Sequence, residues 1–151
     1  MVRILSIGLV LVAIGVVLVG PRPGVAGHEL DGRDIVGGAA LYQDACAACH
    51  GVNLEGQPNW RIANADGTLP APPHDKTGHT WHHDNQLLFD YTKLGGAGLM
   101  AARGRPGFNS GMPGFGDSLS DDEIWNILAY IRSTWPERER EIQAMRNLPH
   151  D

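Results

Sequence analysis

Cys46-Ala47-Ala48-Cys49-His50 contains both cysteines of the chain and places a histidine directly after the second one. Two thiols separated by two residues fit on one helical turn, from which each sulfur can add to one of the two vinyl groups on a haem edge. The next residue then points its imidazole at the iron. The pattern therefore indicates a single covalent c-type haem, with Cys46 and Cys49 attaching the cofactor and His50 as an axial iron ligand.

Two other kinds of site use cysteines at this spacing. A zinc site needs two spaced pairs of Cys or His ligands, and the chain has no second cysteine pair. The four histidines at positions 74, 79, 82 and 83 would complete one only in an unusual spacing. A thioredoxin-like dithiol follows a strand in a βαβ unit, but no alternating β-branched run precedes Cys46. Haem attachment is favoured, and a redox-active dithiol is the main alternative.

The first 27 residues have the pattern of a secretory signal. Met1-Val2-Arg3 is a short basic start, residues 4–19 are almost entirely apolar, and cleavage is expected after Ala26 or Gly27. The apolar run is shorter than the ~20 residues of a spanning helix, although an uncleaved segment would anchor the protein in a membrane. Because bacteria attach haem to c-type proteins outside the cytoplasm, we expect an extracytoplasmic protein, in the bacterial periplasm.

The charge balance argues against a nucleic-acid partner. The chain has 12 Lys and Arg against 17 Asp and Glu, a net charge of −5, and losing Arg3 and Arg22 with the signal leaves 10 against 17, or −7. Nucleic-acid-binding surfaces are basic. An acidic surface would instead steer a basic patch on a redox partner, or simply keep the protein soluble.

Apolar spacing predicts an all-α domain over residues 28–136, with three main helices separated by long Gly- and Pro-rich loops. The first helix is expected from Asp34 to Cys49 and the second over residues 85–94, capped by Asp84 and closed by Gly95. The third starts at a capping box and ends before a proline; its markers are Ser120, Glu123, Trp135 and Pro136. Residues 137–151 form a charged extension, a solvated helix or a frayed tail.

The second axial ligand is predicted to be Met112. Gly111, Pro113 and Gly114 surround it and favour a tight, irregular loop that gives the side chain no regular element to pack from. A thioether is a soft ligand that favours reduced iron and raises the potential. Met100, in a stretch that resembles packed structure, and Met145, in the charged tail, are the rivals.

These features together resemble the class I c-type cytochromes, which are small monohaem electron carriers. Three segments carry the resemblance: Gly38 and Tyr42 before Cys46, Met112-Pro113 followed by Phe115, and a last-helix pattern in residues 119–125 and 129–131. The resemblance implies that the first and last helices cross near Gly38 and Tyr130. It also implies that haem c lies between the attachment helix and the Met112 loop.

The segment from Pro70 to His83 is unusually rich in proline and histidine. In similar cytochromes the carbonyl of a proline-containing loop accepts the Nδ1 hydrogen of the proximal histidine, and Pro70, Pro72 or Pro73 would supply it here. Trp81 and a nearby histidine either donate hydrogen bonds to haem propionates or simply pack against their neighbours and face solvent. A surface copper site is a weaker hypothesis, because the histidine spacing fits no familiar ligand set.

Two classes of function follow. If His50 and Met112 fill both axial positions, the iron only gains or loses an electron, and the protein is a one-electron carrier with redox proteins as partners. If Met112 is absent from the iron or leaves it easily, the protein is a haem enzyme or sensor, although no distal histidine and arginine pair is evident beyond the nearby Arg103 and Arg105. A third version makes the chain the electron-entry subunit of a larger oxidase or dehydrogenase.

Overall fold

The computed structural model describes residues 29–147, so the expected signal or anchor over residues 1–27 lies outside the described residues. Within residues 29–147 every regular element is a helix, which confirms the predicted all-α fold. None of these helices combines the length and apolar character needed to cross a membrane. The elements are α1 (Ile35–Ala45), α2 (Ala47–His50), η1 (Thr80–His82), α3 (Asn85–Ala102), α4 (Asp121–Ser133) and α5 (Glu137–Arg146).

The first predicted helix is present in two segments, because the backbone tightens at Cys46. Asp34 caps α1 by accepting a hydrogen bond from the backbone N–H of Gly37 at 2.9 Å. The carbonyl of Cys46 then accepts the N–H groups of both Cys49 and His50, at 3.1 and 2.9 Å, which winds α2 into a single tight turn. Gly51 ends α2 at φ 84°, a conformation that a side chain would strain.

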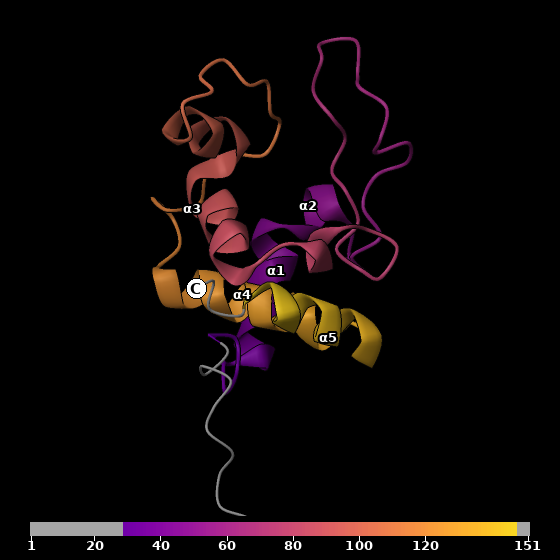
Figure 1. The fold of residues 1–151 in the computed structure, drawn as a ribbon, viewed down its shortest axis with the longest axis vertical. Coiled ribbons are helices and arrows are strands. Elements are labelled where there is room, and N and C mark those ends of the chain that lie inside the picture. Colours follow the sequence, from indigo (N-terminus) through magenta and orange to yellow (C-terminus); the bar gives the residue numbers. More distant parts are fainter. Residues whose placement is uncertain (1–28, 148–151) are drawn as a thin grey trace, which may run out of the picture.

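The crossing of α1 and α4 forms the centre of the fold (Figure 1). A Cβ on Gly38 would overlap the backbone carbonyl of Asn126, so only glycine lets the two helices approach this closely. The contact opposite Gly38 is thus Asn126, one helical turn before the predicted Tyr130. Tyr130 instead packs on Tyr42, with ring centroids 5.5 Å apart.

α3 breaks at Gly95, as the sequence indicates, but a second helical segment follows at once. Gly95 has φ 70° and ψ 166°, outside helical values. The break leaves the carbonyls of Thr92 and Lys93 without their helical partners, and they accept the N–H groups of Phe115 and Gly116, each at 3.0 Å. The predicted end of this helix was therefore wrong, and the break binds the segment that follows Met112.

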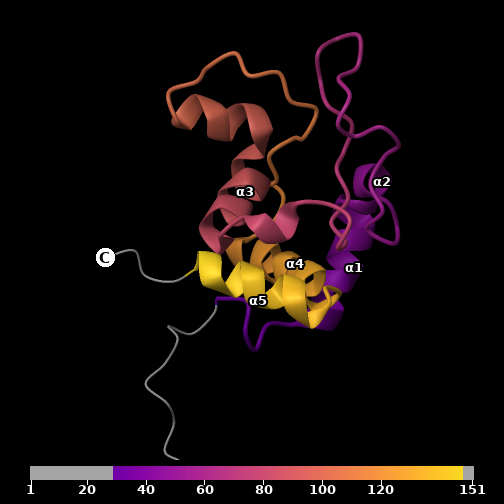
Figure 2. The ribbon, with the colours of Figure 1, turned by 45° about the vertical axis from the view of Figure 1, so that its right-hand side comes forward.

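α4 starts as predicted, and the charged tail is more buried than expected. Ser120 and Glu123 form the reciprocal capping box. α5 packs against η1 and lies along α4 in both ribbon views (Figures 1 and 2). Glu139 and Gln143 of α5 are only 8% and 0% exposed. The predicted helix is confirmed, but it has a buried polar face and is not solvated all round.

Two long loops extend from the same end of the molecule (Figure 2). One covers residues 57–70 and the other residues 103–111. They are joined where the Asn109 side-chain amide donates a hydrogen bond to the carbonyl of Asp66 at 2.6 Å. The fold therefore closes over the space between α2 and α3.

Candidate functional site

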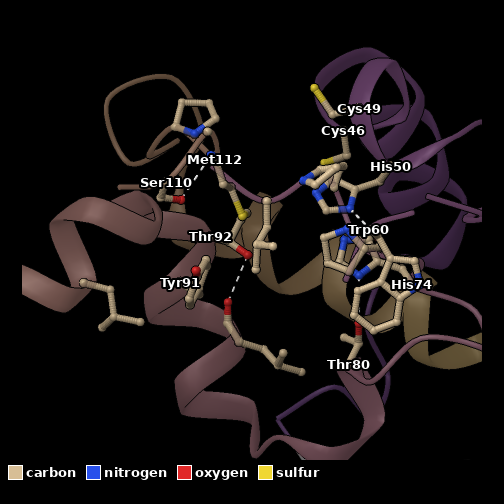
Figure 3. A pocket seen from close by; sticks show the side chains of 18 of the residues that line it. Cys46, Cys49, His50, Trp60, His74, Thr80, Tyr91, Thr92, Ser110 and Met112 are labelled. Carbon is tan, nitrogen blue, oxygen red and sulfur yellow. Dashed lines mark hydrogen bonds between the residues drawn. The ribbon is translucent and has the colours of Figure 1, made fainter. Parts of the chain in front are cut away.

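A cavity of about 660 Å³ lies between α2 and α3 and is lined by all four residues that the sequence predicts to hold the haem. Cys46, Cys49 and His50 line one side, and Met112 lines the other. Figure 3 shows the His50 ring and the Met112 sulfur pointing into the same space from opposite sides. The volume is within the range of about 300–1,000 Å³ that is usual for cofactor and ligand pockets.

His50 is oriented by the loop that faces it. Its Nδ1 lies 2.9 Å from the carbonyl oxygen of Pro72, which selects Pro72 from the three prolines left open by the sequence. A carbonyl only accepts hydrogen bonds, so Nδ1 carries the hydrogen and Nε2 keeps its lone pair. Burial lowers the pKa of His50 more than the bond to Pro72 raises it. The ring is therefore neutral and suited to bind a metal.

His74 supports His50, a role that the sequence did not reveal. The two rings are stacked, with centroids 4.0 Å apart and planes 22° from parallel. His74 is fixed by its Nδ1, 2.8 Å from the Thr80 hydroxyl, and by its carbonyl, which accepts the Trp135 indole N–H at 2.7 Å. Burial lowers its pKa well below the usual value. The only hint in the sequence was the clustering of histidines.

Met112 lies on a loop held by backbone hydrogen bonds. Its carbonyl accepts the N–H of Gly96 at 3.2 Å, and its own N–H donates to the Ser110 hydroxyl at 3.2 Å. The two rival methionines, Met100 and Met145, lie in different surroundings. Met100 also lines the cavity, from the second segment of α3, whereas Met145 lies on α5, 59% exposed and outside the cavity lining. Two methionines can thus reach the cavity.

The thiol environment disfavours the alternative of a redox-active dithiol. Burial, and then the charge of Cys49, raise the pKa of the Cys46 thiol to about 11. Reactive dithiols have a lowered thiol pKa and sit in electropositive surroundings. The described residues also contain no strand that could form a βαβ unit. A thiol that remains protonated at the edge of a large apolar cavity fits a structural attachment point better.

The side of the cavity formed by Trp60, His79, Thr80 and His83 is called the floor below. The Nδ1 atom of His79 is buried there and has no hydrogen-bond partner among the described residues. Trp81 also has a buried indole nitrogen without a partner in this part of the chain, but it packs beside the α1–α4 core and does not line the cavity. The predicted role of Trp81 toward propionates therefore gains no support, whereas His79, the histidine nearby, does line the cavity.

The hypothesis of a separate surface metal site has no structural support in residues 29–147. There, no group of three or more His, Cys, Asp or Glu side chains is arranged to hold a metal ion. His82 stacks on Trp81 with ring centroids 3.7 Å apart, and His79 faces Trp60. The histidines of this segment serve the cavity and the packing beside it.

This arrangement of thiols, imidazole and thioether around one cavity defines a haem-binding protein of the c type. A family model described as Cytochrome c matches residues 35–135, more than half of the chain. The chain belongs to the cytochrome c family. Proteins of this family hold haem c covalently and transfer electrons with redox partner proteins, and the single attachment motif means one haem.

Two curated relatives are both described as thiosulfate dehydrogenase. The protein from Stutzerimonas stutzeri (strain A1501) is 34% identical over 121 residues, covering 71% of this chain and 33% of the relative. The protein from Allochromatium vinosum is 33% identical over 115 residues, covering 71% of this chain and 36% of the relative. The chain thus spans about a third of the length of these relatives. No solved structure matches it significantly.

Proposed function

We propose that this protein is a one-electron carrier whose haem c is attached through Cys46 and Cys49 and ligated by His50 and Met112. The observation that carries the proposal is the placement of the His50 ring and the Met112 sulfur on opposite sides of one cavity (Figure 3). When bound, the iron supplies a one-electron couple between Fe(II) and Fe(III). With both axial positions filled by side chains, no position remains for a substrate.

The protein's own contribution is to hold these ligands in place. The Pro72 carbonyl fixes the tautomer and rotation of His50, which raises the basicity of Nε2. The bond from Gly96 to the Met112 carbonyl, and those from Phe115 and Gly116 to carbonyls of α3, hold Met112 and the residues after it against α3. Ligands that do not move between oxidation states keep the reorganisation on electron transfer small, as a carrier requires.

The ligand assignment is tested by the ferric spectrum of two matched variants. We expect the weak near-red sulfur-to-iron charge-transfer band in the wild-type protein, its loss in Met112→Ala and its retention in Met100→Ala. The reverse pattern would make Met100 the ligand. Haem that stays with the protein through acid-acetone extraction supports attachment at Cys46 and Cys49; haem in the organic layer would refute it.

A second candidate function is electron transfer within a thiosulfate-oxidising enzyme. It is favoured by the two relatives and by Arg103, a cation that lines the cavity and is exposed at its edge. The candidates differ in what reduces the haem. A carrier without its partner stays ferric when thiosulfate is added, and binds carbon monoxide slowly after reduction at neutral pH. Rapid reduction by thiosulfate alone, or rapid carbon monoxide binding, would favour the enzyme.

We also propose how the chain is divided into segments and in which compartment the protein is found. We take residues 1–27 as a signal or uncleaved anchor, residues 28–136 as the cytochrome domain and residues 137–151 as its extension. The apolar run with a basic start supports export, and covalent haem attachment requires an extracytoplasmic compartment, which we take to be the periplasm. Fractionation of the native host checks both points, because a cleaved protein is released with the periplasm and an anchored one stays with the membrane.

A further inference from the structure

The two loops that extend over the cavity carry charge of the opposite sign to the rest of the molecule. Residues 57–70 and 103–111 contain three arginines against one aspartate, a balance of +2. The remainder of residues 29–147 contains seven Lys and Arg against 15 Asp and Glu, or −8. Figure 2 shows both loops at one end of the molecule, and the bond from Asn109 to Asp66 joins them. The acidic net charge of the chain therefore conceals a basic end.

The positive charge of this end is not neutralised by neighbouring carboxylates. Arg61, Arg103 and Arg105 are all exposed. None of them forms an ion pair with a carboxylate of residues 29–147, whereas four other cations in that range do. The carboxylate of Asp66 instead accepts hydrogen bonds from the backbone N–H and the hydroxyl of Thr68, at 2.9 and 2.7 Å. The three guanidinium groups are thus available to groups outside the molecule.

Exposed apolar side chains accompany these arginines. Ile62, Leu69 and Phe108 are 65%, 55% and 40% exposed. Leu69 and Phe108 also line the cavity, as does Arg103, so this end borders the space that the haem is proposed to fill. Protein interfaces typically combine an apolar centre with a polar rim and are enriched in arginine. The six residues are called the loop end below: Arg61, Ile62, Leu69, Arg103, Arg105 and Phe108.

We propose that the loop end is the docking surface for a redox partner that presents an acidic patch, and that the electron crosses there. Salt screens exposed charges over about 8 Å at physiological ionic strength, so the charges closest to the contact decide which partner is attracted. Carboxylates of the partner can pair with the arginines in a bidentate manner. A basic patch, which the net charge alone would favour, is repelled. The docking surface rests on the proposed one-electron function and adds the chemistry of the partner to it.

Small redox reagents of known charge measure the sign of the charge at the point where the electron leaves. The reduced, haem-loaded protein is mixed with ferricyanide, an anion that takes one electron from Fe(II) and becomes ferrocyanide. We expect the rate constant to fall about threefold or more between ionic strengths of about 0.01 M and 0.15 M, because the Debye length shrinks from about 30 Å to about 8 Å. The cation tris(phenanthroline)cobalt(III) should show the opposite dependence. A net charge of −7 acting as a whole predicts the reverse for both reagents.

Two double variants separate local charge from net charge. Arg61→Gln with Arg105→Gln leaves one arginine against one aspartate in the loops, and should remove most of the salt dependence with ferricyanide. Arg138→Gln with Arg146→Gln is the matched control, because it removes the same charge from exposed positions of α5 and leaves the loop end intact. The control should keep the dependence of the wild-type protein.

A ferricyanide rate that rises with ionic strength in the wild-type protein, or an equal dependence in the two double variants, would overturn the docking surface. If the loop variant loses its haem, the two reagents still decide with the wild-type protein alone. Co-sedimentation with vesicles of phosphatidylglycerol and phosphatidylcholine, lost in the loop variant, would overturn the protein partner in favour of an anionic lipid surface. A protein without covalent haem would remove the proposed function itself. Covalent haem together with a ferricyanide rate that rises with salt would remove only the docking surface.

Discussion

His74 and Thr80 show how single side chains preserve the geometry of His50. The imidazole of His74 fills the space behind the His50 ring, and the Thr80 hydroxyl fixes its rotation at 2.8 Å from Nδ1. Thr80 is itself only 5% exposed. When a buried ring nitrogen loses its hydrogen-bond partner, the free-energy cost of removing that nitrogen from water is no longer offset. The support of His50, the proposed proximal ligand, therefore depends in part on this hydroxyl.

We predict that Thr80→Val destabilises the protein by about 1–3 kcal/mol, because valine has the same shape but leaves the Nδ1 of His74 unpaired. Urea unfolding of the haem-loaded protein, followed by circular dichroism, measures the change. Thr80→Ser keeps the hydroxyl and should retain most of the stability. Unchanged stability in Thr80→Val would contradict the role of the hydrogen bond, and a loss confined to Thr80→Ser would assign the effect to the methyl group.

At the scale of elements, the broken helix α3 positions Met112. A continuous helix would use the carbonyls of Thr92 and Lys93 internally, whereas the break at Gly95 offers them to Phe115 and Gly116. A Cβ on Gly95 would overlap the backbone at Pro113 and Gly114. One residue without a side chain thus lets the Met112 loop lie directly on the helix.

Gly95→Ala should weaken or abolish the near-red sulfur band while leaving the haem covalently attached. The added methyl group pushes the Met112 loop away, and the left-handed backbone at φ 70° strains any side chain. Gly98→Ala on the same helix is the control, since its Cβ would meet only the Leu94 side chain, at 3.5 Å. A full band in Gly95→Ala would show that the break does not position the ligand.

The capping box of α4 makes a separate prediction. Ser120→Ala should destabilise the fold by about 1 kcal/mol, the usual cost of losing an N-cap.

Glu123 makes the stability of the same cap depend on pH. The bonds from the backbone and side chain of Ser120 lower the pKa of Glu123. The contribution of Glu123 to folding stability is therefore complete above the unfolded pKa of about 4.3 and is lost as pH falls through the lower folded pKa. Unfolding midpoints of wild type and Glu123→Gln between pH 3 and pH 6 should differ least at the acid end. A constant difference would contradict this.

At the scale of the whole molecule, α5 packs through polar contacts against the start of α3 and the residues just before it. The Gln143 amide donates to the side chain of Asn85 at 2.5 Å and lies 3.4 Å from the carbonyl of His83, while Asn147 accepts the N–H of Asn85 at 2.7 Å. Gln143 is fully buried. The charged extension thus caps the start of α3 and holds the segment that carries the floor histidines.

Gln143→Leu should therefore cost about 1–3 kcal/mol in the free energy of unfolding, because it leaves the buried side-chain oxygen of Asn85 without this donor. Met145→Ala, on the same helix but 59% exposed, should change it by less than about 0.5 kcal/mol. Thermal unfolding of the haem-loaded variants provides the comparison. If both variants behave like the wild type, α5 does not contribute to the stability of the domain.

Sequence patterns identified the features that depend on neighbouring residues and missed those that depend on distant ones. The cap at Asp84 and the box at Ser120 each act within a few residues, and both are present. The break at Gly95 is also present, although the helix resumes after it. The choice of Pro72, the contact of Gly38 with Asn126 and the burial of Gln143 join segments far apart in the chain. The alternating charges of residues 137–141 gave no sign that Gln143 two residues later would be buried.

The hydrogen bond between Asn109 and the Asp66 carbonyl links the two loops that reach the cavity from its opposite faces. The loop of residues 57–70 leads to Pro72 behind His50, and the loop of residues 103–111 leads to Met112. Local opening of one loop should therefore loosen the other, so that both behave as a single cooperative unit. Amide hydrogen exchange would then give these two stretches one shared opening free energy, and Met112, the proposed thioether ligand, could not move away without also relaxing the loop behind His50.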